Sequence, residues 1–172
     1  MITQDPKLWL DIGLVKNGNM KRSEVRQIIK EALEDKVKEC PAPTQDLELN
    51  TSNRNRAIQA DYIKYGPLNL SDEGYWVEYA KKWGPTTSPE EAKKSNCSNC
   101  VAFDISPRME VCMPGSTDED GRLGYCWMHH FKCHSARTCY TWAAGGPIKD
   151  DNASYDWQKR NLKGALSTEP IS

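Results

Sequence analysis

The stretch "SNCSNCVAFDISPRMEVCMPGSTDEDGRLGYC", Ser95 to Cys126, places four cysteines within 32 residues of a polar chain. Cys97 and Cys100 form a C-x-x-C pair, which brings two sulfurs to one centre through a tight turn. Cys112 and Cys126 follow singly, after intervals of 11 and 13 residues. In a chain that folds in a reducing compartment, clustered thiols are more often metal ligands than disulfides.

The spacing of these cysteines bears on which metal they could hold. A zinc ribbon has two C-x-x-C turns that face each other, whereas this stretch has one close pair and two distant single cysteines. A cubane 4Fe–4S cluster suits this pattern better, because each of its four irons needs its own thiolate and the corners are reached from several directions. Zinc is the alternative metal, and two structural disulfides would require an oxidising compartment.

Short polar and flexible residues surround the four cysteines. Asn96 and Asn99 favour the turn of the C-x-x-C pair, and Gly124 leaves room for a close approach beside Cys126. Aromatic side chains crowd the same module and are expected to shield a cluster from water. These aromatic residues are Phe103, Tyr125, Trp127, Phe131, Tyr140 and Trp142.

Three segments carry a resemblance to a known family: N-C-S-N-C (96–100), C-M-P-G (112–115) and G-Y-C-W (124–127). They resemble the ligand segments of high-potential iron–sulfur proteins (HiPIPs), which have a C-x-x-C pair, a third cysteine before Pro-Gly and a fourth within Gly-(Tyr/Trp)-Cys. The resemblance implies a small irregular α+β module stabilised by a metal cluster and flanked by helical arms. It also implies one iron of a 4Fe–4S cluster on each of four thiolates: Cys97, Cys100, Cys112 and Cys126.

Two further segments, L-G-Y-C-W-M-H-H-F (123–131) and C-Y-T-W-A-A-G-G-P-I (139–148), point to a second resemblance. They are similar to small virion structural proteins of tailed cyanobacterial phages that carry a HiPIP-like module. This resemblance implies a virion component, made in the host cytoplasm, whose partners are other phage structural proteins. The alternatives are a soluble one-electron carrier of the HiPIP type and a zinc-stabilised interaction module.

Helical patterns flank the cysteine module. Apolar residues recur on one face of a helix expected over 20–39, and aromatic residues do so over 72–83. Ser88-Pro89 predicts the start of a short helix, and a last helix is expected over 154–166. Residues 41–57 are polar and are expected to form an irregular linker.

The apolar faces of the first two helices have little nearby to pack against. They either pack on the cysteine module or dock on partner subunits, and the small module and long linker favour the partners. We expect four segments: an N-terminal arm (1–57), a helical connector (58–95), the Cys-rich module (96–148) and a C-terminal helix with a tail (149–172).

Composition excludes several classes of protein. The net charge is −1 without a basic block, which argues against nucleic-acid binding. No stretch reaches the length of apolar residues that a membrane span needs. The N-terminus lacks the features of a secretory signal, so the chain is expected to fold in a reducing cytoplasm.

The apolar fraction is 38%, which predicts no single well-packed core through the whole chain. A module of about fifty residues buries too little apolar surface to offset its chain entropy. Metal bonds are therefore expected to contribute heavily to its folding.

The remaining reactive residues form no catalytic constellation, so no enzyme activity is expected. His129 and His130 are adjacent and point in different directions on regular structure, so these histidines, and His134 with them, are expected to be ordinary hydrogen-bonded or surface residues. Cys133 and Cys139 are expected to form a short disulfide or to be two buried thiols, although one of them could replace Cys112 in a different cluster arrangement.

Overall fold

The computed structural model describes residues 20–67, 71–115 and 117–166. The chain divides into two compact units, Met1–Lys36 and Val37–Ser172. Residues 37–57, which we expected in the N-terminal arm, therefore belong to the same unit as the cysteines. The first 19 residues, on which the prediction of no secretory signal depends, lie outside the described residues.

Helix α1 (Arg22–Lys38) confirms the helix predicted over 20–39. Glu24 lies in its first turn and accepts a hydrogen bond from the backbone N–H of Lys21 at 2.9 Å. A carboxylate at this position also interacts favourably with the helix dipole. On the apolar stripe, the side chains of Val25 and Ile29 are 41% and 53% exposed.

The linker predicted over 41–57 is wrong, because the structure has two helices there, α2 (Ala42–Gln45) and α3 (Leu47–Gln59). The side chain of Asp46 caps α3 by accepting a hydrogen bond from the backbone N–H of Leu49. Amide side chains hold α3 against β4 and the turn before it: Asn50 Oδ1 accepts from the N–H of Lys132 at 2.8 Å, and Asn53 Nδ2 donates to a backbone carbonyl there at 2.7 Å. A helix held by amides lacks the apolar stripe from which helices are predicted.

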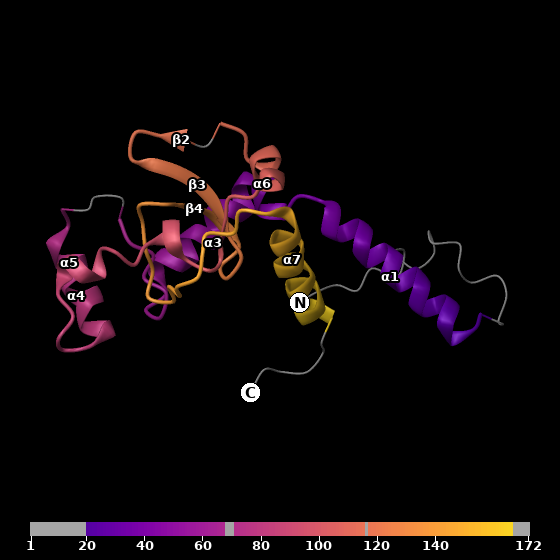
Figure 1. Ribbon diagram of the computed structural model, residues 1–172, viewed down its shortest axis with the longest axis horizontal. Helices are drawn as coiled ribbons and strands as arrows, with labels where there is room; N and C mark the ends of the chain where they lie inside the picture. Colours follow the sequence, from indigo (N-terminus) through magenta and orange to yellow (C-terminus); the bar gives the residue numbers. More distant parts are fainter. Residues whose placement is uncertain (1–19, 68–70, 116, 167–172) are drawn as a thin grey trace. The chain divides into compact units, whose positions relative to one another are not determined.

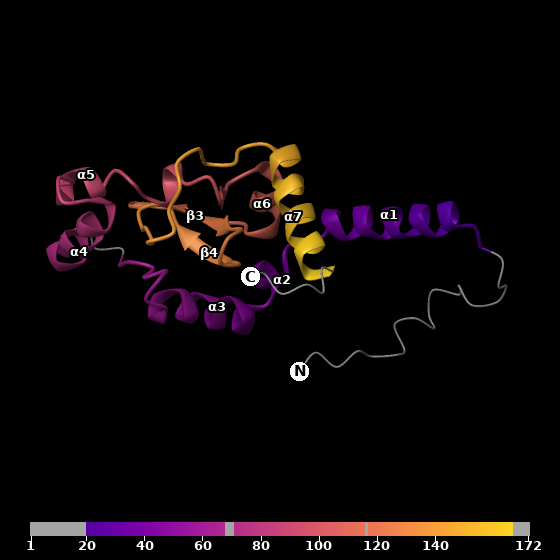
Figure 2. The ribbon, with the colours of Figure 1, turned by 90° about the horizontal axis from the view of Figure 1, so that it is seen from below.

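A four-stranded antiparallel sheet forms the centre of the second unit within the described residues. Strand β3 pairs with each of the other three strands. Figures 1 and 2 show β3 and β4 side by side. The register places Phe103 and Phe131 opposite Cys126, and Cys133 opposite Gly124. The strands are β1 (Phe103–Asp104), β2 (Thr117–Asp118), β3 (Gly121–Cys126) and β4 (Phe131–His134).

Position 124 requires glycine mainly because an aromatic ring, and not only the backbone of a neighbouring strand, lies against it. A Cβ atom on Gly124 would lie 2.4 Å from Cε2 of Phe103. The ring of Phe103 therefore lies across β3 at this point, next to Cys126 in the register.

Helix α4 (Glu73–Trp83) confirms the second predicted helix, and α5 (Pro89–Ala92) confirms the short one. Their apolar faces form a separate small core of Trp76, Tyr79, Ala80 and Ala92. Tyr140 from the cysteine module stacks on Tyr79, with ring centroids 5.7 Å apart. The apolar face of α4 thus packs within its own chain, which is the first of the two alternatives expected for it.

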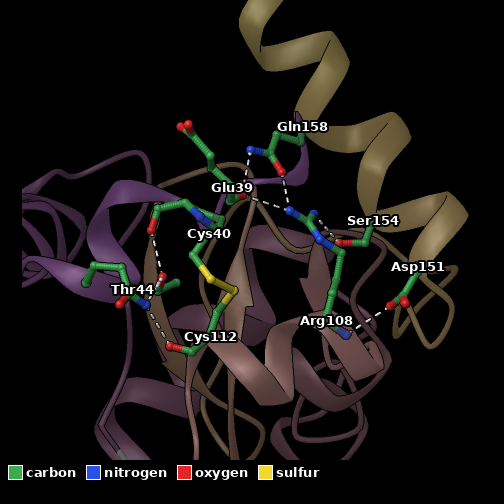
Figure 3. Close-up of a disulfide and its surroundings, with 10 residues drawn as sticks. Glu39, Cys40, Thr44, Arg108, Cys112, Asp151, Ser154 and Gln158 are labelled. Atoms are coloured by element: carbon green, nitrogen blue, oxygen red, sulfur yellow. Dashed lines mark hydrogen bonds between the residues drawn. A yellow bond between two sulfur atoms is a disulfide. The ribbon is translucent and has the colours of Figure 1, made fainter. Parts of the chain in front are cut away.

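Helices α6 (Pro107–Cys112) and α7 (Asp151–Leu166) pack through a buried arginine (Figure 3). The guanidinium of Arg108 donates hydrogen bonds to Ser154 Oγ at 2.9 Å and to Gln158 Oε1 at 2.5 Å. It also donates to the carbonyl of Glu39 at 3.0 Å. Figures 1 and 2 show α4 and α5 at one end of the sheet and α7 at the other.

The main core is separate from the small core on α4 and α5, so the described residues have no single core, as the composition predicted. The main core contains Tyr65, Phe103, Met109, Tyr125, Trp127 and Phe131, together with every cysteine of the chain except the partly buried Cys40, which packs against it. Aromatic residues and cysteines supply most of this interior. The chain is therefore a small mixed α+β protein, in agreement with the coarse fold class predicted. No helix in the described ranges has the length and hydropathy needed to cross a membrane.

Candidate metal centre

All seven cysteines lie in the described part of the chain, and five of them are free thiols that line one pocket. Each of the five is buried, with less than a tenth of its surface exposed. They come from different segments of the second unit: Cys97 and Cys100 from a 3₁₀ turn, Cys126 from β3, Cys133 from β4 and Cys139 from the loop after β4.

The C-x-x-C turn is a 3₁₀ helix, η2 (Cys97–Asn99), held by the asparagines that flank it. The Asn96 side chain accepts from the N–H of Ser98 at 3.1 Å, and the Asn99 side chain accepts from the N–H of Asn96 at 3.2 Å. Trp142 Nε1 donates to the Asn96 carbonyl and to Asn99 Oδ1, both at 2.9 Å. The predicted role of the two asparagines in this turn is confirmed.

The β3–β4 hairpin places Cys126 and Cys133 on the same face of the sheet. Cys126 pairs with Phe131 and Gly124 pairs with Cys133, so these four residues share one face by the two-residue period of strands. The ring of Phe103 fills the space beside Gly124 on this face, and Cys133 contacts the sulfur of Cys126. This arrangement could have been predicted from the sequence if the hairpin had been recognised.

Cys139 is delivered by a loop that is tied to residues far away in the chain. The N–H of Tyr140 donates to the carbonyl of Ile63 at 2.6 Å, and Thr138 Oγ1 donates to the carbonyl of Ser95 at 2.6 Å. The sulfur of Cys139 lies 3.2 Å from Thr141 Oγ1. The two backbone-carbonyl contacts, to Ile63 and Ser95, join residues that are more than 40 positions apart, so local sequence patterns could not predict the place of Cys139.

The five sulfurs differ in their hydrogen-bond partners. The Cys126 sulfur accepts from the backbone N–H groups of Met128 and His129 and from the thiol of Cys133, and this last contact lowers the pKa of Cys126. Burial raises the pKa of Cys133 well above its usual value, and its contacts with the sulfurs of Cys126 and Cys97 raise it further.

Cys100 and Cys139 are stabilised by donors from the loop that contains Thr141. Burial raises the pKa of Cys100, and the N–H groups of Ala143 and Ala102 oppose this increase. Burial raises the pKa of Cys139 to about 12, and the hydroxyl and N–H of Thr141 oppose it. Donors to sulfur favour the thiolate, which is the form that binds metals.

The walls of the pocket are mostly aromatic. Besides the five cysteines, the lining consists of Tyr65, Phe103, Met128, His129, Phe131 and Trp142. The space between these side chains has a volume of about 10 Å³, which is room for about one water molecule. A bound cluster would therefore require the thiol side chains to rotate outward.

Cys112 does not belong to this group, contrary to the expected ligand set. It is bonded to Cys40, with a Cα–Cα distance of 5.6 Å, and Figure 3 shows this disulfide beside α6. Gln45 Nε2 donates to the carbonyl of Cys112 at 3.0 Å. A sulfur in a disulfide is not a thiolate and cannot bind iron, so the structure brings together Cys97, Cys100 and Cys126 of the predicted set and excludes Cys112.

The histidines are hydrogen-bonded, as predicted. His129 Nε2 lies 2.6 Å from Thr141 Oγ1, and His130 Nδ1 lies 3.3 Å from the hydroxyl of Tyr125. His134 Nε2 lies 3.0 Å from a carboxylate oxygen of Asp118 on β2. Burial lowers the pKa of His129 to about 4, so this side chain is neutral at pH 7.

The arrangement of the thiols bears on whether the pocket suits a single zinc ion or a 4Fe–4S cluster. Among the described residues, no three His, Cys, Asp or Glu side chains are arranged to hold a single metal ion. A zinc ion with sulfurs at ~2.3 Å requires all four donors around one point. A cubane spreads its four thiolates over four irons, and five buried thiols in an aromatic pocket fit that chemistry in number and type.

No protein-family model matches the chain, and neither do curated proteins or solved structures at a significant level. We therefore infer the function from the residues of this chain.

Proposed function

We propose that this protein binds a 4Fe–4S cluster through thiolates of the pocket lined by Cys97, Cys100, Cys126, Cys133 and Cys139. Three of these are the ligands expected from the sequence, and the fourth comes from the same pocket in place of Cys112. The observation that carries the proposal is that five reduced thiols from separate segments line one pocket. When bound, the cluster would add four covalent links between these segments and could exchange one electron.

The simplest alternative is that these cysteines are small apolar residues of a core. Free cysteine is among the most buried residue types, and a single buried thiol needs no further explanation. Five thiols around one pocket are harder to explain in this way. Several sulfurs also accept backbone N–H groups, which stabilise a thiolate rather than a thiol.

Metal and acid-labile sulfide analysis of the full chain, purified without air, tests the proposal. We expect about four irons and four sulfides per chain, with the brown colour and broad visible absorption of a cluster. One zinc per chain would support the zinc-stabilised module instead. Protein that contains no metal and remains fully folded would overturn both the 4Fe–4S proposal and the zinc-stabilised module.

One observation favours electron exchange as a second candidate function. Trp142 lines the thiol pocket and contacts Trp83 edge-to-face, with ring centroids 5.6 Å apart. Trp83 is 43% exposed, so the pair connects the pocket to the surface. Voltammetry of the iron-loaded protein tests this function. Trp83→Leu should slow electron exchange with the electrode, and Tyr62→Leu, which removes another exposed aromatic ring, should not.

A place in a larger assembly, such as a phage virion, is the third part of the proposal. It is supported by the resemblance of 123–131 and 139–148 to phage structural proteins and by the exposed apolar side chains Val25 and Ile29 on α1. In this role the cluster stabilises the fold of a subunit, and α1 contacts neighbouring subunits. Detection of the chain with its iron in purified phage particles would support it, and a chain present in infected cells but absent from particles would contradict it.

A further inference from the structure

We infer that Cys139 supplies the fourth thiolate of the cluster, with Cys97, Cys100 and Cys126, and that Cys133 lies beside the cluster without binding iron. This inference rests on the proposed function, because it names the ligands of the same centre. It differs from the ligand set expected from the sequence, in which Cys112 was the third ligand.

The sulfurs of the pocket differ in the hydrogen-bond donors that reach them. Metal-bound thiolates are stabilised by hydrogen bonds from the surrounding protein. Cys100 and Cys126 each accept two backbone N–H groups. Cys139 shares this property, because both the N–H and the hydroxyl of Thr141 reach its sulfur.

Cys133 differs from Cys139 in this respect. Its hydrogen-bond contacts include two other sulfurs, those of Cys126 and Cys97. The N–H groups of its neighbours on β4, Lys132 and His134, donate to side-chain oxygens of other segments. The contacts of Cys133 are thus with neighbouring sulfurs, whereas Cys139 contacts a hydroxyl and an N–H of its own loop.

The cysteines also differ in the direction from which they approach the pocket. A cubane is bound at four corners, so its ligands must come from different sides. The turn η2, the end of β3 and the loop at Cys139 are three separate segments. Cys133 instead shares a sheet face with Cys126 and already contacts its sulfur, so it is better placed to donate a hydrogen bond to that ligand.

The protons balance in this arrangement. A thiolate-bearing carrier delivers the preassembled cluster, and the thiols of Cys97, Cys100, Cys126 and Cys139 each displace one carrier thiolate from iron. Each iron–sulfur bond to the carrier breaks as a new one forms, the proton of the incoming thiol passes to the thiolate that leaves, and no electron is transferred. The fifth thiol, Cys133, takes no part in the exchange and donates a hydrogen bond to the sulfur of Cys126.

The experiment compares Cys139→Ala with Cys133→Ala in the full chain, purified without air. We expect Cys133→Ala to keep about four irons and four sulfides, and Cys139→Ala to lose at least one iron per chain. Because a hydrogen bond to a ligand sulfur raises the reduction potential, we also expect Cys133→Ala to lower the potential of the cluster. Cys112→Ser serves as the matched control and should keep the full iron content.

A second pair of variants covers the case in which Cys139→Ala does not fold. Serine can bind iron through oxygen, so Cys139→Ser should keep the fold and shift the visible absorption bands, whereas Cys133→Ser should leave these bands in place. Loss of iron in Cys133→Ala, with or without loss in Cys139→Ala, would overturn the assignment.

The proposed function and this assignment fail in different ways. Wild-type protein without iron and sulfide would refute the cluster itself. Wild-type protein with four irons, whose content depends on Cys133 or does not depend on Cys139, would refute the assignment alone.

Discussion

Cys40 and Cys112 are separated by 72 positions in the sequence and are joined by a disulfide. The bond connects the chain just after α1 to the end of α6. It removes Cys112 from the predicted ligand set and gives a structural role to Cys40, for which the sequence alone offered none. The disulfide and the thiol pocket are thus two separate uses of cysteine in one compact unit.

Replacing both disulfide cysteines, Cys40→Ser with Cys112→Ser, should destabilise the protein and leave its metal content unchanged. In the chain-entropy model, a disulfide that closes a loop of this length contributes about 4 kcal/mol to the free energy of unfolding, and the variant should lose this contribution. Urea unfolding of the variant and of wild-type protein, with and without a reductant, measures the loss. If iron disappeared together with the disulfide, Cys112 would have to be a ligand after all.

Arg108→Ala should be strongly destabilising because Arg108 is 8% exposed and bonded to both α7 and the chain after α1. Truncation leaves the carbonyl of Glu39 and the side chains of α7 without this partner, which costs about 3 kcal/mol. Thermal or urea unfolding measures the difference, with the exposed Arg26→Ala as the control. Equal stability of the two variants would show that α6 and α7 do not depend on this network.

Three helices could be predicted from the sequence because their apolar or aromatic residues repeat with the helical period. Helix α3 could not, because Asn50 and Asn53 hold it to the β4 hairpin and leave no apolar stripe. Strands β1 and β2 have two residues each, which is too short for an alternating pattern to be recognised.

Part of the candidate site could also be predicted from the sequence. Cys97, Cys100 and Cys126 could be chosen from their spacing and flanking residues. Cys139 reaches the pocket through backbone contacts to Ile63 and neighbouring segments, which spacing does not reveal. The one available signal was compositional, since six of the seven cysteines lie between Cys97 and Cys139.

Asn50→Ala should loosen α3, because Asn50 is 8% exposed and its Oδ1 accepts the N–H of Lys132 at 2.8 Å. The backbone N–H would then lose its partner, at a cost of about 1–2 kcal/mol. Asn55→Ala, on an exposed position of the same helix, is the matched control and should change stability by less than about 0.5 kcal/mol. Hydrogen exchange at Lys132 should become faster in the first variant and stay unchanged in the second.

Stability should fall as the pH is lowered from about 6.5 to about 4, partly because of His129. Burial lowers the pKa of His129 to about 4, whereas in the unfolded chain the pKa is near the ordinary value of about 6.5. Below pH 6.5 the unfolded state therefore binds a proton that the folded state does not, and unfolding is favoured. Urea unfolding at pH 7 and pH 5 should show a smaller loss for His129→Gln than for wild-type protein, and an equal loss would contradict the assignment.

Trp142→Phe should weaken the hold on the C-x-x-C turn without removing the aromatic wall. The indole N–H of Trp142 donates to the Asn96 carbonyl and to Asn99 Oδ1, both at 2.9 Å, and phenylalanine keeps a ring but has no donor. The turn would open more often, so a chelator should remove iron several-fold faster from the variant, and in metal-free protein Cys97 and Cys100 should be alkylated faster. Trp157→Phe, on α7, is the control because Trp157 lies outside the lining of the thiol pocket. Equal rates in the two variants would mean that the asparagines hold the turn without the indole.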